Sequence, residues 1–285
     1  MIPLKDDLPT SRFPVITVAI IAINVAVFIW QWTFPTDPQL SQPPLDLGSI
    51  DQSSLEYGAV PYRMTHPDEK GDCAIGAVNE FGEAGVVCPG TPEFAEAEVR
   101  GQEDPTQRPI PIEQAAWFVT LFTSMFMHGG ILHIGGNMLF LWVFGNNIED
   151  SMGRIKFVLF YLLAGLVAVY SQAGLDPDST APTIGASGAV AGVLGGYALL
   201  HPAARVLTLI FIIFFVTLVE IPALILLSIW FVLQFLPAIG EVATDVSGEG
   251  GVAYFAHVGG FIFGLAAIKL FARRRRDPEP PLPVY

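Results

Sequence analysis

The sequence predicts an all-α polytopic membrane protein with six membrane-spanning helices, and three observations lead to this prediction. The 285-residue chain is 52% hydrophobic and only 14% charged, whereas roughly 25% of the residues in an ordinary soluble protein are charged. Its mean hydropathy is +0.52. Several of its apolar runs approach the ~20 residues that an α-helix needs to cross a bilayer.

Six apolar segments are expected to cross the membrane. The first, residues 13–34, is too long for the core of a signal peptide, and it lacks a clearly positive flank and a small-residue cleavage site. We therefore expect it to be retained as a span. The other five are expected near residues 131–148, 155–170, 187–200 with a few residues before it, 221–239 and 252–272. Residues 131–272 would thus carry spans 2 to 6.

Residues 35–130 are predicted to form a long acidic loop between the first two spans. This stretch is rich in Pro, Gly and acidic residues and lacks sustained periodicity, so we expect only short structured pieces in it. Residues 117–127 are apolar but too few to cross a bilayer, which favours an interfacial or re-entrant helix. Cys73 and Cys88 form a disulfide if this loop faces an oxidising space, or they remain two free thiols.

The placement of charge predicts the orientation. The net charge is −13, and most of the excess acid lies in residues 36–114. Positive residues gather on the cytoplasmic side of membrane proteins. This rule puts both termini, residues 1–12 and the basic, Pro-rich tail 273–285, in the cytoplasm. It also leaves a single crossing between Arg205 and the last span, so that residues 206–219 would form an interfacial or packed segment on the cytoplasmic side. The basic residues used are Arg154, Lys156, Arg205, Lys269 and Arg273 to Arg276.

Four polar residues are expected at one depth in the membrane. Polar groups are costly in a bilayer, so each is a functional candidate. His133 and Asn137 lie near the start of span 2, Ser187 at the start of span 4 and His257 near the start of span 6. At ~1.5 Å per residue, all four lie within roughly 5 to 12 Å of the outer helix ends. A serine, a candidate base and candidate oxyanion donors therefore converge.

Small residues predict how the serine and the histidine approach each other. Ser187, Ala191, Gly195 and Ala198 form one helix face with little bulk, and Gly260 and Gly264 follow His257 on another. Such small-xxx-small faces let membrane helices pack closely. A serine among glycines usually serves packing alone, but agreement in depth, order and face favours a site. Since no aspartate lies at this depth, the site would be a Ser/His dyad.

Three motifs carry a resemblance to the rhomboid intramembrane serine proteases. They are His128-x4-His133-x3-Asn137, Gly185-Ala-Ser187-Gly188 and Ala256-His257-x2-Gly260-x3-Gly264, and the resemblance covers roughly residues 12–272. It implies a six-helix bundle in which span 5 gates the lateral entry of substrate. It also implies that Ser187 is the nucleophile, that His257 is the general base, and that His133, Asn137 and the Ser187 backbone N–H form the oxyanion hole. His128 would be a structural organiser, and Gly185, Gly188, Gly260 and Gly264 would support the site structurally.

The chain departs from the family pattern in three places. Val119-Thr120 stands where a Trp-Arg pair is usual, and Ala191 stands where an aromatic residue often stacks on the catalytic histidine. The first loop is also long. These departures bear on loop architecture and substrate preference more than on the chemistry.

Two functions are weighed for this pattern. The first is a serine endopeptidase that cleaves transmembrane segments of single-span or other membrane proteins through an acyl-enzyme. The second is a non-catalytic rhomboid-like protein that binds or sorts membrane helices, which would be expected to lack Ser187 or His257. A metal site of His128, His133 and His257 lacks the carboxylate and the HExxH pattern of a zinc protease. We expect no cofactor, metal or nucleic-acid partner, and a location in the inner or plasma membrane of a bacterium.

Overall fold

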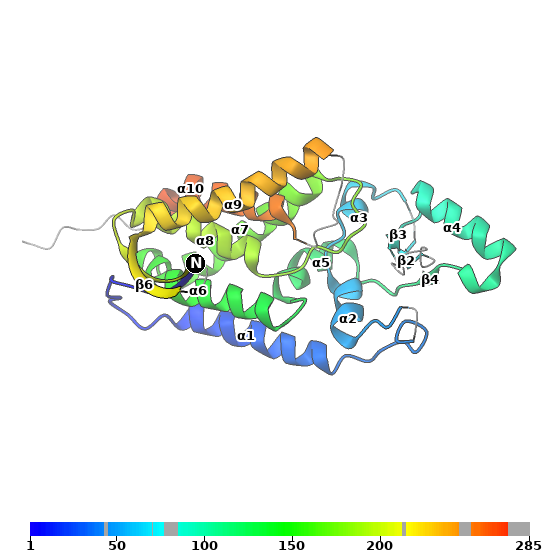
Figure 1. Cartoon of the computed structure of the whole chain (residues 1–285), viewed down its shortest axis with the longest axis horizontal. Coiled ribbons are helices and arrows are strands. Elements are labelled where there is room, and N and C mark those ends of the chain that lie inside the picture. Colours follow the sequence, from blue (N-terminus) through cyan, green and yellow to red (C-terminus); the bar gives the residue numbers. More distant parts are fainter. Residues whose placement is uncertain (43–44, 70, 77–84, 213–214, 245–251, 273–285) are drawn as a thin grey trace, which may run out of the picture.

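The computed structural model describes residues 1–42, 45–69, 71–76, 85–212, 215–244 and 252–272. The molecule is elongated, with a small sheet at one end of a helix bundle and a folded insert between α1 and α5 at the other (Figure 1). The long helices of the bundle are α1 (Val15–Trp32), α6 (Ile131–Met152), α7 (Arg154–Leu175), α8 (Ser187–Leu200), α9 (Ala223–Thr244) and α10 (Tyr254–Phe271).

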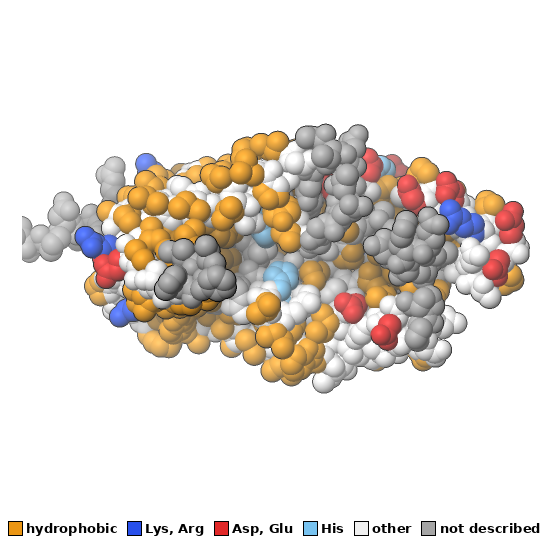
Figure 2. Space-filling model, viewed as in Figure 1, with side chains coloured by type: hydrophobic (Ala, Val, Ile, Leu, Met, Phe, Trp, Pro, Cys, Tyr) orange, Lys and Arg blue, Asp and Glu red, His pale blue; other side chains and the backbone are white. Residues whose placement is uncertain are grey.

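The helix lengths show an integral membrane protein, and hydrophobic side chains cover much of the face of the bundle seen in Figure 2. Among the described residues, α1, α7, α9 and α10 are long and apolar enough to cross a membrane. A fifth candidate is α6 taken together with α5 (Trp117–Thr123) and the 3-10 turn η2 (Ser124–Phe126), which are bent from it by 78°. This bent pair agrees with the short helix expected at residues 117–127. At 14 residues, α8 is shorter than a span, so the count of six stays a prediction.

The short helix α8 lies at the centre of the bundle. It contacts α6, α7, α9 and α10, and its residues from Gly188 to Ala198 are all buried. Towards the end of the bundle that carries the sheet, the core is filled by fully buried aromatic side chains: Phe144, Phe157, Phe160, Tyr161 and Tyr197. Ser187 begins the helix at the opposite end, where the packing residues are small. The part of the bundle between Ser187 and the sheet is therefore tightly packed.

Within residues 206–219, expected as a packed or interfacial segment, residues 206–212 and 215–219 belong to two paired strands. Strands β5 (Arg205–Ile212) and β6 (Phe215–Pro222) pair antiparallel, and β1 (Ile2–Asp6) adds to the outer edge of β5. This sheet corrects the prediction of an all-α chain. Its β-branched and aromatic residues favour strands, and the Arg205 guanidinium lies 3.3 Å from the Glu220 carboxylate across the hairpin.

The N-terminal strand is tied to the bundle by a buried carboxylate. Asp6 accepts hydrogen bonds from the Tyr197 hydroxyl on α8 and the Asn147 amide on α6, each at 2.6 Å. A buried charge is stable only when such donors surround it. The contact fixes the sheet against the end of α8 that is farther from Ser187.

The acidic stretch before α5 is folded rather than a loop with isolated pieces. It contains α2 (Ser49–Tyr57), α3 (Pro61–Thr65), α4 (Pro92–Glu103), the 3-10 turn η1 (Pro105–Gln107) and a sheet of β2 (Ala74–Ile75), β3 (Val86–Val87) and β4 (Ile110–Pro111). The elements are too short to show periodicity in sequence. Cys73 and Cys88 form a disulfide within this insert, which resolves the two alternatives for this pair.

The insert also holds the chain that leads into α8. The backbones of Ala59 and Thr183 exchange hydrogen bonds of 3.1 and 2.7 Å, and the Tyr62 N–H donates to the Ser179 carbonyl at 2.9 Å. Backbone pairing of this kind restrains a segment that would otherwise be a free surface loop. The stretch preceding Ser187 is therefore fixed from outside the bundle.

Candidate active site

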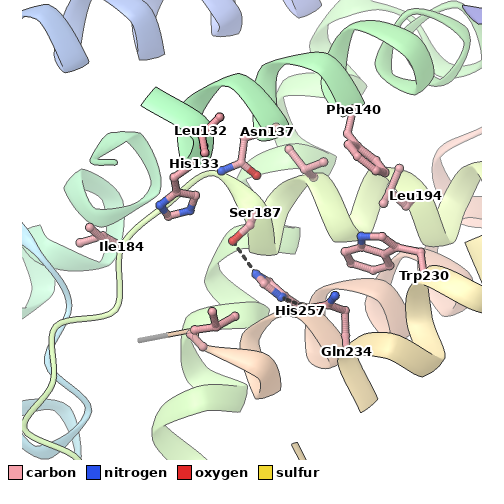
Figure 3. Close-up of a pocket in the computed structure, with 14 residues that line it drawn as sticks. Leu132, His133, Asn137, Phe140, Ile184, Ser187, Leu194, Trp230, Gln234 and His257 are labelled. Atoms are coloured by element: carbon pink, nitrogen blue, oxygen red, sulfur yellow. Dashed lines mark hydrogen bonds between the residues drawn. The ribbon is translucent and has the colours of Figure 1, made fainter. Parts of the chain in front are cut away.

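The site is a cavity of about 470 Å³ that opens among α6, α8, α9 and α10. Figure 3 shows the side chains that surround it, with Ser187 pointing toward His257 and Asn137 and His133 on the opposite wall. Its lining is mostly apolar, and its polar groups include His133, Asn137, Ser187, Gln234 and His257. No aspartate or glutamate lines it within the described part of the chain. An apolar pocket with a few convergent polar groups is typical of a binding or catalytic site.

Ser187 and His257 are joined by a short hydrogen bond. The serine Oγ lies 2.7 Å from the His257 Nε2 (Figure 3), within the range for a nucleophile and its base. The two residues are 70 positions apart in sequence and come from α8 and α10. Such a bond allows the imidazole to take the serine proton when the hydroxyl attacks.

Glycines bring the two helices into backbone contact. A Cβ at Gly260 would collide with the Gly188 carbonyl oxygen, and one at Gly264 would collide with the Gly192 carbonyl oxygen. The expected partner face on α8 included Gly195, where a Cβ would collide with the Phe261 carbonyl. Close approach of small residues is how helices associate in lipid, where apolar burial gives little driving force. The packing of α8 on α10 therefore sets the distance between serine and histidine.

The turn before Ser187 requires a glycine for two reasons. Gly185 has a φ of +119°, which residues with a Cβ rarely adopt. A Cβ there would also lie 2.7 Å from the His133 Nε2. The turn thus brings the start of α8 and the His133 ring together. Ser187 is the first residue of α8, and N–H groups in the first turn of a helix have no intrahelical acceptor.

Asn137 and His133 place hydrogen-bond donors on the side of the cavity opposite His257. The Asn137 side chain is buried, and its Nδ2 has no hydrogen-bond partner among the described residues. An unpaired buried amide is costly, so the Asn137 amide is expected to bind water or a ligand in the cavity. The Gly129 N–H donates to the His133 Nδ1 at 3.4 Å, which leaves Nε2 as the N–H of a neutral ring. Both donors face the cavity that contains Ser187 (Figure 3).

His128 lies next to the turn that precedes Ser187 and is fully buried. Its Nδ1 lies 3.2 Å from the Phe126 carbonyl, its Nε2 accepts from the Ala186 N–H at 3.5 Å, and its own N–H donates to the Gln31 side chain at 2.9 Å. The ring also meets His133 edge-on at 5.1 Å between centroids. These contacts tie α1, the α5–α6 bend and the turn before Ser187 together, and the role of His128 as a structural organiser stays a prediction.

Comparison with known proteins identifies the family. Residues 115–274, more than half of the chain, match the family model of the rhomboid domain. The chain belongs to the rhomboid family. Similar proteins include rhomboid protein 1, mitochondrial, of Saccharomyces cerevisiae, 30% identical over 152 residues that cover 52% of this chain and 40% of the relative.

Shorter matches extend the comparison. The rhomboid protease GluP of Bacillus subtilis is 38% identical over 84 residues, 30% of this chain and 16% of the relative. RHOMBOID-like protein 1 of Arabidopsis thaliana is 34% identical over 109 residues, 33% of this chain and 26% of the relative. The match spans less than half the length of each of these relatives. The yeast relative is named as a mitochondrial protein, which weighs against the predicted location in a bacterial membrane. The relative GluP, in contrast, comes from a bacterium.

Two residues of α9 complete the site of this rhomboid-family protein and were missed from sequence. Gln234 Oε1 lies 2.7 Å from the His257 Nδ1. The Trp230 ring lies beside the same imidazole, 6.1 Å between centroids and tilted by 42°. The sequence signal for Gln234 was a lone amide within an apolar helix, a position that usually indicates function. Trp230 supplies an aromatic neighbour that Ala191 cannot.

The structure can be compared with the alternative of a metal site formed by histidines. Among the residues that the structure describes, no group of three or more His, Cys, Asp or Glu side chains is arranged to hold a metal ion. The sequence alternative of a site formed by His128, His133 and His257 requires such a group. In the structure, the His128 and His257 rings have backbone and side-chain partners instead.

Proposed function

We propose that this protein is an intramembrane serine endopeptidase in which Ser187 is the nucleophile and His257 the general base. The observation that carries the proposal is the 2.7 Å hydrogen bond between the Ser187 Oγ and the His257 Nε2. It lies in a cavity that also holds the unpaired amide of Asn137. The similarity to GluP, whose name identifies a protease, supports the same activity.

Acylation uses the geometry of this pair. As the Ser187 Oγ forms a bond to the carbonyl carbon of the scissile peptide, its proton passes to the His257 Nε2. The carbonyl oxygen becomes an oxyanion that accepts hydrogen bonds from the Asn137 Nδ2, the His133 N–H and the Ser187 backbone N–H. The intermediate then collapses, the C–N bond breaks, and His257 gives its proton to the leaving amine.

Deacylation repeats these steps with water. A water molecule gives a proton to His257 and attacks the ester carbonyl, and the same donors stabilise the second oxyanion. Collapse breaks the bond to the Ser187 Oγ, which regains its proton from His257. The products are a new carboxylate and a free enzyme, so no cofactor takes part.

The substrates we propose are transmembrane segments that enter laterally past α9. This helix is the least enclosed of the four single-helix candidates, with 22% of its apolar window buried against 28% for α1 and 44% for α7 and α10. Its side chains Trp230 and Gln234 form one wall of the cavity (Figure 3). We also propose six spans, α8 included, with both termini in the cytoplasm. The disulfide of the insert supports an oxidising space on the opposite side.

A fluorophosphonate probe tests this proposal directly, because it reacts with a serine only when the hydroxyl is activated. We expect one adduct, on the peptide that contains Ser187, measured by mass spectrometry of the protein in liposomes. His257→Ala should slow the labelling by on the order of 100-fold or more, since the base is lost. Ser171, a second membrane serine, should stay unlabelled. Labelling at another residue, or labelling that is insensitive to His257→Ala, would contradict the proposal.

Asn137→Ala is expected to lower kcat by about 100- to 1,000-fold with little change in KM, because the amide acts on the oxyanion rather than on the bound substrate. The measurement is cleavage of a labelled transmembrane substrate at several substrate densities in liposomes. Asn146→Ala, the same change at the other end of α6, serves as the control and should keep kcat within about two-fold. Equal losses in both variants would assign Asn137 a role in folding only.

A further inference from the structure

Gln234 holds a ring nitrogen that the catalytic steps above do not use. It lies on α9 and lines the cavity, and its Oε1 is 2.7 Å from the His257 Nδ1 (Figure 3). The other nitrogen of the same ring, Nε2, is equally close to the Ser187 Oγ. Three side chains from three helices therefore form one chain of hydrogen bonds that ends at the nucleophile.

The chemistry of imidazole determines which ring nitrogen of His257 carries the proton in this arrangement. In a neutral ring one nitrogen carries a proton and the other accepts, and the partner of the first nitrogen sets which is which. The Gln234 carbonyl oxygen is an acceptor, so Nδ1 carries the proton and Nε2 is free to take the proton of Ser187. With the tautomers exchanged, Nε2 would carry a proton already and could not act as a base.

The environment assigns this role to Gln234 alone among the described residues that line the cavity. No carboxylate is present there to accept from Nδ1. The nearest aromatic ring, Trp230, offers a face and an N–H donor, neither of which can replace an acceptor. The flanking side chain Leu233 is 58% exposed on the surface of α9. Gln234 is the one amide side chain in the α9 sequence, and it faces His257.

We propose that Gln234 is a positioning residue that fixes the tautomer and the orientation of the general base, and that catalysis therefore requires α9 to be docked against α10. The inference rests on the proposed protease activity. Because Gln234 and His257 lie on different helices, displacement of α9 removes the acceptor from Nδ1. Substrate entry past α9 then leaves the base unpositioned until the helix returns.

A purely structural role would give a different result, and Gln172 provides the matched control. Gln172 on α7 accepts a hydrogen bond from the Ala256 N–H at 3.3 Å. It links a second helix to α10 beside His257 without touching the imidazole. Gln172→Leu and Gln234→Leu therefore each remove one interhelical hydrogen bond to α10, but only the second removes the acceptor from the base.

The experiment measures kcat, KM and thermal stability of the full chain in liposomes, with active sites counted by fluorophosphonate labelling. The proteins compared are wild type, Gln234→Leu, Gln234→Glu and Gln172→Leu. We expect Gln234→Leu to lower kcat about 10- to 100-fold at nearly unchanged KM. Gln234→Glu, which keeps an acceptor oxygen, should recover activity to within a few-fold of wild type. Gln172→Leu should keep kcat within about two-fold.

Three results would overturn the inference. One is a Gln234→Leu variant with the kcat of wild type, and another is a loss that Gln234→Glu does not recover. The third is an equal loss in Gln172→Leu, which would assign both glutamines to helix packing. If wild-type cleavage does not depend on Ser187, the proposed function fails and this inference falls with it. If cleavage depends on Ser187 but not on Gln234, only this inference fails.

Discussion

Replacing Ser187 by alanine is expected to lower cleavage of a transmembrane substrate by on the order of 10,000-fold or more, with the protein still folded. The change removes one oxygen, the only atom that can form the acyl-enzyme, from a side chain 2.7 Å from its base. Alanine fits the site because Ser187 begins a helix next to the small residues Ala186 and Gly188. The measurement is product formation from a fluorescently labelled single-span protein in liposomes, followed on gels over hours.

Comparison with a second variant tests whether Ser187 and His257 act as one unit. Residues that share one step give losses that do not add. The double variant Ser187→Ala, His257→Ala should therefore be only slightly less active than either single variant. Chelation with EDTA should leave the wild-type rate unchanged, because no metal takes part in the proposed steps. Cleavage that persists in Ser187→Ala, or that EDTA abolishes, would contradict the serine mechanism.

The sequence predicted those features that follow from the thickness of the bilayer, namely the positions of the long helices and the depth of the polar residues in them. Apolar run length predicted the helices to within a few residues, as for α10, expected at residues 252–272 and observed at Tyr254–Phe271. A shared depth for Ser187 and His257, together with glycine faces on both helices, predicted their proximity. These arguments need only the rise of a helix and the small volume of glycine. The catalytic roles of the two residues stay predictions.

The parts that were missed depend on rotation about a helix axis and on long-range pairing. Gln234 contacts His257 only because the face of α9 that carries it is turned towards α10. The sequence of an apolar helix has little periodicity from which this rotation could be predicted. The hairpin of β5 and β6 was hidden because a continuous apolar run does not distinguish a strand from a helix. The insert has elements of two to twelve residues, and its disulfide depends on the folded proximity of Cys73 and Cys88.

Gly264→Ala is expected to destabilise the protein by about 2 kcal/mol or more, because the added methyl group meets backbone and not a movable side chain. The Cβ would collide with the Gly192 carbonyl oxygen and lie 2.9 Å from the Gly196 nitrogen. Relief requires α8 and α10 to separate. A displacement of about 1 Å at an active site can cost on the order of 100-fold in rate. We therefore expect a lower Tm, followed by tryptophan fluorescence, together with a lower kcat.

Gly135→Ala is the matched control, since it adds the same methyl group to α6, where no described residue outside the adjoining turns of α6 brings an atom within 4 Å of the new Cβ. Alanine also favours a helix over glycine by about 0.5 to 1 kcal/mol, so this variant should be as stable as wild type or more so. If helix propensity alone governed these glycines, both variants would gain stability. Loss of both Tm and kcat in Gly264→Ala only would show that stability and catalysis depend on the backbone contact between α8 and α10.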